Sequence, residues 1–160
     1  MDDLEEFKRY RERMNARILS AGNLEIKRFF ALDTRAYEKG ALDVKTKELL
    51  GLVASTVLRC NDCITYHVIR CVQEGVSDEE LLEALNVVLI VGGLITIPHI
   101  RRAVDVLDQC REKQRKADRL SFSALNPIPA VIAGTALNQL WLFWTAPIIG
   151  TLLVAVVWHS

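Results

Sequence analysis

Apolar residues recur at helical spacing from the N-terminus to Arg119, and no alternating strand pattern occurs in that range. Residues 4–19 place a few apolar side chains among many charges, which is typical of a solvated amphipathic helix. A second helix is predicted over residues 24–37, and Asp43 can cap a third over residues 44–58. The apolar residues of the third helix, which indicate deep burial, are Val44, Leu49, Leu50, Leu52, Val53 and Val57.

The helical pattern continues further along the chain. Residues 63–73 form a short predicted helix, and the "EG" that follows fits a C-terminal stop with a left-handed glycine. Ser77 and Glu80 form a capping box that begins a helix over residues 78–95. This helix becomes so apolar in "ALNVVLIVGGL" that we expect it to be buried on all sides. Pro98 suits the first turn of a last helix, "PHIRRAVDVLDQCREKQRK", so the pattern predicts an all-α fold.

The end of the chain differs in character, because residues 120–160 contain no aspartate, glutamate, lysine or arginine. Residues 120–129 contain serines and two prolines and predict a linker. The apolar run that follows exceeds the roughly 20 residues needed to cross a bilayer, and it has tryptophans toward both ends and a basic cluster before it. We therefore predict a helical domain (1–119), a linker and an apolar, membrane-inserted tail helix (130–160). The alternative is a hydrophobic helix that packs on the domain or in an oligomer interface.

Charge limits the partners and the compartment. The 20 basic and 20 acidic residues cancel, so no net field favours a nucleic acid. The N-terminal segment "MDDLEEFKRYRERM" is highly charged and lacks the apolar stretch of a secretory signal, so we expect the N-terminal domain to be cytoplasmic. Thiols are kept reduced there, which favours a catalytic or metal-binding role for a CxxC pair over a structural disulfide.

The stretch "RCNDCITYHVIRC" contains such a pair. On a helix, positions three and four apart share a face, so Cys60, Cys63 and His67 form one stripe. A thiol at a helix N-terminus, with a histidine one turn away as proton acceptor, ionises more readily, and the thiolate is the form that attacks peroxides and disulfides. A second thiol three residues away can then resolve a sulfenic acid or a mixed disulfide.

Glu48 places a carboxylate in the otherwise apolar stretch "ELLGLVAS". Two interpretations are open. The carboxylate can be solvated, or it can face the cysteine helix. In the second case it would accept a proton from His67 or hold the imidazole in a useful tautomer.

A zinc site is the main alternative for the same residues. Such a site needs about four ligands, of which Cys60, Cys63 and His67 supply three, and Cys71 could be the fourth. Four ligands on one helix cannot easily surround an ion, so we expect no bound metal. We expect Cys71 and Cys110 to be buried as small hydrophobic residues.

The order Glu48, Cys60, Cys63, His67, followed by "EGVSDEELLEAL" and "VVLIVGG", resembles the carboxymuconolactone decarboxylase family, specifically its AhpD-like alkylhydroperoxidase branch, over residues 25–109. The resemblance implies an AhpD-like helical bundle and a thiol-dependent peroxidase or disulfide reductase. Matched by position, Cys63 would be the attacking sulfur and Cys60 its resolving partner and proton donor. Glu48 and His67 would form a proton relay.

The same resemblance bears on substrates and partners. It implies a peroxide or disulfide substrate, no bound cofactor, a dithiol electron donor such as a lipoylated protein, and assembly into trimers or hexamers. The chain departs from the best-known members at Asn61 and Asp62, between the cysteines. A carboxylate beside Cys63 would oppose thiolate formation and so slow the reaction.

Other functions stay open at this point. The fold can serve as a non-enzymatic helical oligomerisation or redox-sensing module, or as a carboxymuconolactone decarboxylase-like enzyme, although decarboxylase members lack the redox pair. The tail "ALNQLWLFWTAPIIGTLLVAVVW" resembles the last membrane helix of the aquaporin family. One helix cannot form a pore, so the tail would at most be an anchor.

Overall fold

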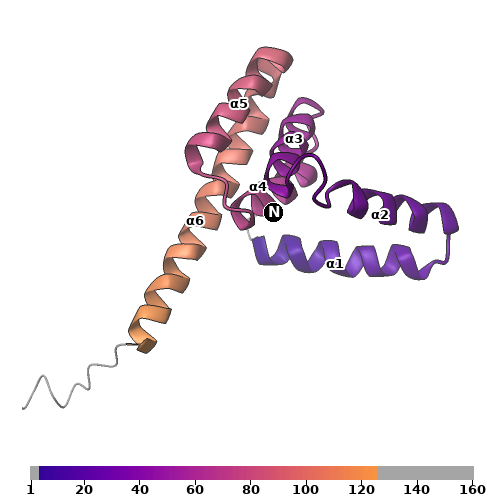
Figure 1. Cartoon of the computed structure of the whole chain (residues 1–160), viewed down its shortest axis with the longest axis horizontal. Coiled ribbons are helices and arrows are strands. Elements are labelled where there is room, and N and C mark those ends of the chain that lie inside the picture. Colours follow the sequence, from indigo (N-terminus) through magenta and orange to yellow (C-terminus); the bar gives the residue numbers. More distant parts are fainter. Residues whose placement is uncertain (1–3, 126–160) are drawn as a thin grey trace, which may run out of the picture. The chain divides into compact units, whose positions relative to one another are not determined.

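Helices account for nearly all of residues 4–125, the part of the chain that the computed structural model describes (Figure 1). By internal contacts the chain divides into two units, residues 1–115 and 116–160. No strand occurs in the described range, which confirms the predicted all-α class. The elements are α1 (Leu4–Ser20), α2 (Leu24–Ala36), α3 (Val44–Val57), α4 (Asn61–Gln73), α5 (Asp78–Gly92), the 3-10 helix η1 (Gly93–Thr96) and α6 (Ile97–Leu125).

The helices begin where side chains can satisfy the free backbone N–H groups of a first turn. The Asp43 carboxylate accepts from the N–H of Thr46 at 2.7 Å and begins α3. Ser77 and Glu80 form the predicted reciprocal capping box at the start of α5. The local signals read from the sequence therefore act as expected, and α2 begins in the same way at Asn23.

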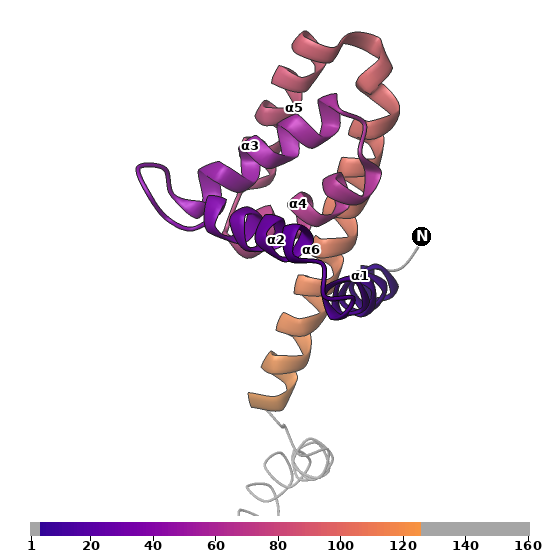
Figure 2. The same ribbon diagram turned by 90° about the vertical axis from the view of Figure 1, so that its right-hand side faces the viewer.

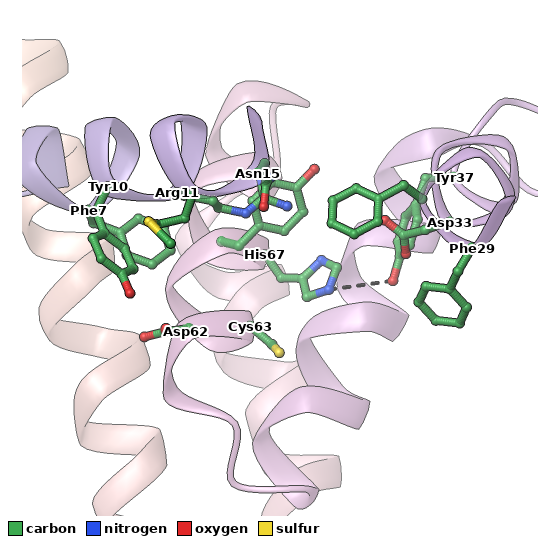
Figure 3. A pocket seen from close by; sticks show the side chains of 13 residues that line it. Phe7, Tyr10, Arg11, Asn15, Phe29, Asp33, Tyr37, Asp62, Cys63 and His67 are labelled. Carbon is green, nitrogen blue, oxygen red and sulfur yellow. Dashed lines mark hydrogen bonds between the residues drawn. The ribbon is translucent and has the colours of Figure 1, made fainter. Parts of the chain in front are cut away.

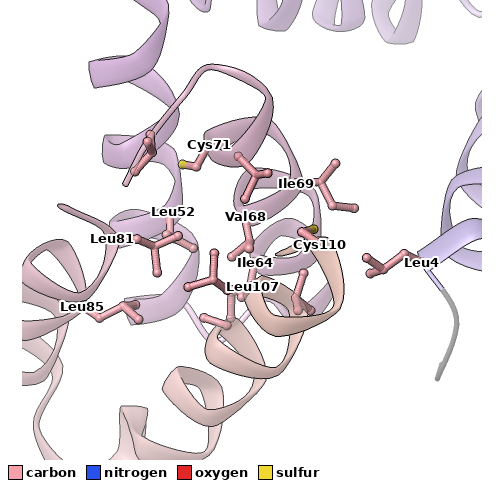
Figure 4. Close-up of a cluster of buried hydrophobic side chains, with 14 of the residues drawn as sticks. Leu4, Leu52, Ile64, Val68, Ile69, Cys71, Leu81, Leu85, Leu107 and Cys110 are labelled. Carbon is pink, nitrogen blue, oxygen red and sulfur yellow. The ribbon is translucent and has the colours of Figure 1, made fainter. Parts of the chain in front are cut away.

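The core is formed where α3, α4, α5 and α6 pack together, with the first turn of α1 added (Figure 4). Its fully buried apolar side chains include Leu52, Ile64, Val68, Leu81 and Val88. The prediction of deep burial along the whole third helix was wrong, because Leu52 alone of its six apolar positions is fully buried and Leu50 is 55% exposed. The reason is that α3 carries apolar residues on more of its circumference than α4 and α5 cover.

The prediction that α5 is buried on all sides was also wrong for this single chain. One face of α5 packs into the core through Leu81, Leu85 and Val88. The remainder of α5 and η1 presents a second apolar surface to solvent, which we call the α5 face. It consists of Leu82, Val87, Ile90, Val91, Leu94 and Ile95, of which Ile90 and Leu94 are each 85% exposed.

The first two helices form an antiparallel hairpin beside α3 and α4 (Figures 1 and 2). α1 is attached through the buried side chains of Leu4 and Phe7, and Lys113 of α6 forms an ion pair with Glu5 at 3.0 Å. α2 buries no residue completely. The hairpin is therefore held mainly by α1, and it covers one side of α4.

The predicted linker and tail extend beyond the described residues. α6 continues to Leu125, so residues 120–125 of the predicted linker are helical; serine is tolerated in a helix, and the first proline of this region is Pro127. Residues 126–129 and the predicted tail, 130–160, lie outside the described residues.

One described stretch, Asp78–Phe122, is long and apolar enough to cross a membrane by length and composition alone. Only 22% of its most apolar window is buried. The stretch contains the α5 face, and it is separate from the predicted tail. Core helices of soluble proteins can have the same length and apolar composition, so this stretch is weak evidence for a membrane span.

Candidate active site

The two cysteines of the CxxC motif lie at the N-terminus of α4. Cys60 is the N-cap residue and Cys63 lies in the first turn, and their sulfurs form a disulfide with the Cα atoms 5.3 Å apart. The preceding turn requires the left-handed conformation at Arg59, and the N–H of Cys60 donates to the carbonyl of Ser55 at 3.0 Å. The helix N-terminus favours a negative charge on Cys63 once the disulfide is opened.

A buried carboxylate lies next to the histidine of the same helix. Glu48 is 1% exposed, and its Oε2 lies 2.8 Å from Nδ1 of His67. Its other oxygen accepts from Nε of Arg70 at 3.1 Å, and Arg70 also donates to Glu74 at 2.7 Å. The structure therefore supports the second interpretation of Glu48: the carboxylate faces the cysteine helix, and both of its oxygens accept hydrogen bonds.

The other ring nitrogen of His67 faces Tyr37, the C-cap residue of α2. The Tyr37 hydroxyl lies 3.4 Å from Nε2, and the two rings are in contact. Because Glu48 accepts from Nδ1–H, the neutral imidazole keeps a lone pair on Nε2, and the hydroxyl donates to it. Burial raises the pKa of Tyr37, and the nearby carboxylates of Glu48 and Asp33 raise it further. The tyrosine therefore keeps its proton at neutral pH.

A glycine makes room for this arrangement. A Cβ at Gly51 would lie 2.5 Å from Cε1 of His67 and 2.7 Å from the Tyr37 hydroxyl. Both distances are far below van der Waals contact. Only glycine at this position of α3 lets the imidazole and the phenol approach as closely as they do.

Cys63 and His67 open into one cavity of about 370 Å³ (Figure 3). Most of its lining is aromatic or apolar and comes from the α1–α2 hairpin. The guanidinium of Arg11 stacks over the Tyr66 ring at 3.8 Å on one wall. The aromatic and apolar lining residues are Phe7, Tyr10, Met14, Phe29, Phe30, Tyr37 and Tyr66.

A second, more polar cavity of about 480 Å³ reaches the other end of the relay. Glu48 and Arg70 line it, whereas Cys63 and His67 do not. Tyr37 lines both cavities. The buried pair of Glu48 and His67 thus lies between a mainly apolar cavity on the cysteine side and a polar cavity on the carboxylate side.

Of the two residues between the cysteines, Asp62 lines the mainly apolar cavity and Asn61 does not. Figure 3 shows the Asp62 side chain directed away from the Cys63 sulfur, which weakens its opposition to a thiolate. The Oδ1 atom of Asn61 accepts a hydrogen bond from Nδ1 of His99 at 2.9 Å. Cys71 and Cys110 are buried in the core, as predicted, and burial raises the pKa of Cys71 to about 12.

Metal binding has no support in this part of the molecule. Within the described range, no group of three histidine, cysteine, aspartate or glutamate side chains could hold an ion. Cys71, the fourth ligand of the zinc alternative, packs in the core instead.

The sequence interpretation missed Tyr37, Gly51, Arg70 and the aromatic wall of the hairpin. Arg70 had a detectable signal, because it follows His67 by three residues and so shares its helix face. Tyr37 and Gly51 had none, since their role depends on how the end of α2 packs against α3.

Residues 26–106 match the family model of the carboxymuconolactone decarboxylase family. The chain belongs to this family, which confirms the predicted membership. A curated relative, "Uncharacterized protein 4 in cox locus" of Paracoccus denitrificans, is 33% identical over 81 residues, which are 51% of this chain and 73% of that protein.

Two solved structures have the same fold. A family protein of Thermotoga maritima, linked as a possibility to the antioxidative response, has 58% identity and a TM-score of 0.68, with coverage of 70% of this chain and 95% of that one. The apo form of a family protein of Legionella pneumophila has 25% identity and a TM-score of 0.63, with coverage of 69% and 98%.

Proposed function

We propose that this protein is a thiol-dependent peroxidase that uses Cys60 and Cys63 as a redox pair. The observation that carries the proposal is the shared cavity of Cys63 and His67, with His67 hydrogen-bonded to the buried carboxylate of Glu48. The description of the Thermotoga maritima relative in terms of an antioxidative response supports the same class of chemistry.

The reaction begins from the dithiol form. His67 accepts the thiol proton of Cys63 while Glu48 stabilises the imidazolium. The thiolate attacks the terminal oxygen of a hydroperoxide, so that an S–O bond forms, the O–O bond breaks and an alkoxide leaves as the alcohol once protonated. Cys60 then attacks the sulfenic acid, releases water and forms the disulfide that the structure contains.

The cavity supports an organic hydroperoxide as the substrate. Its lining is mostly aromatic and apolar, and it is large enough for a substituted alkyl or aryl group. We expect kcat/KM for such a hydroperoxide to exceed that for hydrogen peroxide by at least about tenfold, because each buried methylene contributes to transition-state binding.

A dithiol closes the cycle. It attacks the Cys60–Cys63 disulfide, and its second thiol resolves the mixed disulfide, which returns both cysteines to thiols. A lipoyl group on a partner protein fits this chemistry, because its two thiols form a 1,3-dithiol that closes into a cyclic disulfide, and its carbon chain is apolar.

Peroxide consumption by the full chain tests the proposal. Dihydrolipoamide serves as the reductant and cumene hydroperoxide as the oxidant, and Cys63→Ser should abolish turnover. Cys110→Ala is the matched control, since Cys110 is buried in the core away from the cavity, and it should retain turnover. A parent protein that consumes no peroxide while its disulfide still forms would favour the non-enzymatic redox-sensing alternative.

We propose further that the protein assembles through the α5 face into a trimer or hexamer. Contiguous exposed apolar surfaces of this kind usually mark association, and this one lies on α5 and η1.

The membrane association of the tail remains a proposal from sequence. Residues 130–158 are uncharged and apolar apart from Asn138, Gln139 and three threonines, and the basic cluster before them would keep the thiol domain cytoplasmic. Carbonate washing of membranes from cells that express the full chain tests it. Protein found in the soluble fraction without detergent would contradict it.

A further inference from the structure

Tyr37 is the cavity side chain that connects the histidine to the space where a substrate would lie. Its hydroxyl is 3.4 Å from Nε2 of His67, and it lines the same cavity as Cys63. We propose that Tyr37 is a catalytic residue that protonates the leaving oxygen of the hydroperoxide. This inference rests on the proposed peroxidase function.

The hydrogen bonds of His67 make Tyr37 the side chain to which the proton on Nε2 can be passed. Nδ1 is committed to Glu48 at 2.8 Å, so only Nε2 exchanges protons with the cavity. Among the described side chains that line the cavity, Tyr37 is the one hydrogen-bonded to that nitrogen. Catalytic hydrogen bonds are often long before substrate binds, so 3.4 Å is compatible with a working contact.

The proton transfers balance over one turnover. Nε2 takes the thiol proton of Cys63 while the Tyr37 O–H rotates away from Nε2. The Tyr37 oxygen can then accept a hydrogen bond from Nε2–H, because a hydroxyl has two acceptor positions besides its one donor. After the O–O bond breaks, the leaving RO⁻ takes the hydroxyl proton of Tyr37, and the tyrosine oxygen takes the proton on Nε2. The products are ROH and the Cys63 sulfenic acid, with Tyr37 and His67 back in their starting forms.

Two features of the surroundings suit this role. Burial, together with the carboxylates of Glu48 and Asp33, raises the pKa of Tyr37, so the hydroxyl keeps its proton at neutral pH. The leaving alkoxide is a stronger base than a phenolate, so it can still take that proton. The absence of a side chain at Gly51 lets the hydroxyl and the imidazole meet, since a Cβ there would lie 2.7 Å from the hydroxyl. The phenol is thus held at His67 by packing as well as by its hydrogen bond.

The test compares two oxidants whose leaving groups differ in basicity. Cumene hydroperoxide releases an alkoxide that needs a proton, whereas peracetic acid releases acetate, which needs none. In the full chain, Tyr37→Phe should lower kcat/KM roughly 100-fold for cumene hydroperoxide and less than about threefold for peracetic acid. Tyr66→Phe is the matched comparison: Tyr66 contacts the His67 ring by its edge, and the ratio between the two oxidants should stay at the parent value.

Each result decides the question. Equal losses for both oxidants would mean that Tyr37 only holds His67 in place, and no loss for either would mean that the hydroxyl is dispensable; both overturn the inference. The thiol proton transfer is common to both oxidants, so the solvent deuterium isotope effect on the parent protein should be larger with cumene hydroperoxide than with peracetic acid. Equal isotope effects with the two oxidants would also overturn the inference. A parent protein that consumes neither oxidant overturns the proposed function itself.

Discussion

Glu48 and His67 lie 19 residues apart in the sequence and are joined by a 2.8 Å hydrogen bond between Oε2 and Nδ1. Packing of α3 against α4 brings them together, and almost no solvent reaches the carboxylate. The second carboxylate oxygen is occupied by Arg70. A buried carboxylate with both oxygens hydrogen-bonded has one orientation, so it fixes the imidazole on the cavity wall.

The first prediction concerns this pair. Glu48→Gln and His67→Ala should each lower turnover by roughly 100-fold or more, in line with general acid–base contributions. Because the two side chains act as a unit, the double variant should lose little beyond the worse single variant. Steady-state kinetics with cumene hydroperoxide measures all three.

Folding controls accompany these variants. Glu83→Gln changes an exposed carboxylate on α5 and should leave turnover at the parent level. Urea unfolding separates loss of the fold from loss of the relay. Multiplicative losses in the double variant, with each single variant folded, would contradict a relay.

The second prediction is that Cys60 and Cys63 form a reversible disulfide in solution. Mild peroxide should protect both from alkylation, and dihydrolipoamide should restore their reactivity. Cys71 and Cys110 should be alkylated slowly in both states, because they are buried and burial raises their pKa. Mass spectrometry of the alkylated peptides reads all four sites, and free thiols at Cys60 and Cys63 after oxidation would exclude the redox pair.

The third prediction concerns Gly51. Gly51→Ala should lower turnover by at least about tenfold, because the new methyl group pushes His67 and Tyr37 out of position. Overpacking costs about 1–3 kcal/mol, and the better helix propensity of alanine offsets up to about 1 kcal/mol, so stability should fall only slightly. Gly40→Ala is the control, since a Cβ there meets only Lys47 Nζ at 3.8 Å. Unchanged turnover in Gly51→Ala would show that the close approach is unimportant.

Local patterns predicted the helices of this protein well. Each of the α-helices α1 to α6 begins within two residues of its predicted start, because caps such as Asp43 and Ser77 act through neighbouring backbone groups. The same local rules place the two cysteines at the N-terminus of one helix and His67 one turn later. The part of the site that lies on a single helix was therefore predictable.

Tertiary packing decided the rest. Tyr37 comes from the end of α2 and Glu48 from α3, and no spacing rule connects them to His67. The α5 face was wrongly predicted to be buried within the chain. A strongly apolar helix indicates that some surface covers it, and the sequence does not say whether that surface belongs to the same chain.

The fourth prediction concerns pH. The Cys71 thiol has an ordinary pKa of 9.0 when unfolded and about 12 in the folded protein. Above about pH 9 the unfolded chain loses a proton that the folded protein keeps, so the free energy of unfolding should fall by up to roughly 1.4 kcal/mol per pH unit. Below the unfolded value the stabilisation is complete. Urea unfolding of the oxidised protein at several alkaline pH values should give a smaller slope for Cys71→Ala, and equal slopes would contradict the burial of this thiol.

The fifth prediction is that the α5 face joins copies of the chain. Ile90 and Leu94 are each 85% exposed and lie near its centre, so a charge at both positions would have to be buried unpaired in any interface. The parent protein should be a trimer or hexamer by light scattering, and Ile90→Lys combined with Leu94→Lys should shift it to the monomer. Glu12→Lys places the same charge on an exposed position of α1 rather than on the α5 face and should leave the oligomer intact. All samples contain the same mild detergent, so that association through the predicted tail does not contribute to the measured mass. A parent protein that stays monomeric at micromolar concentration would show that the α5 face has another occupant, and binding of the parent but not the double variant to lipid vesicles would identify that occupant as a membrane.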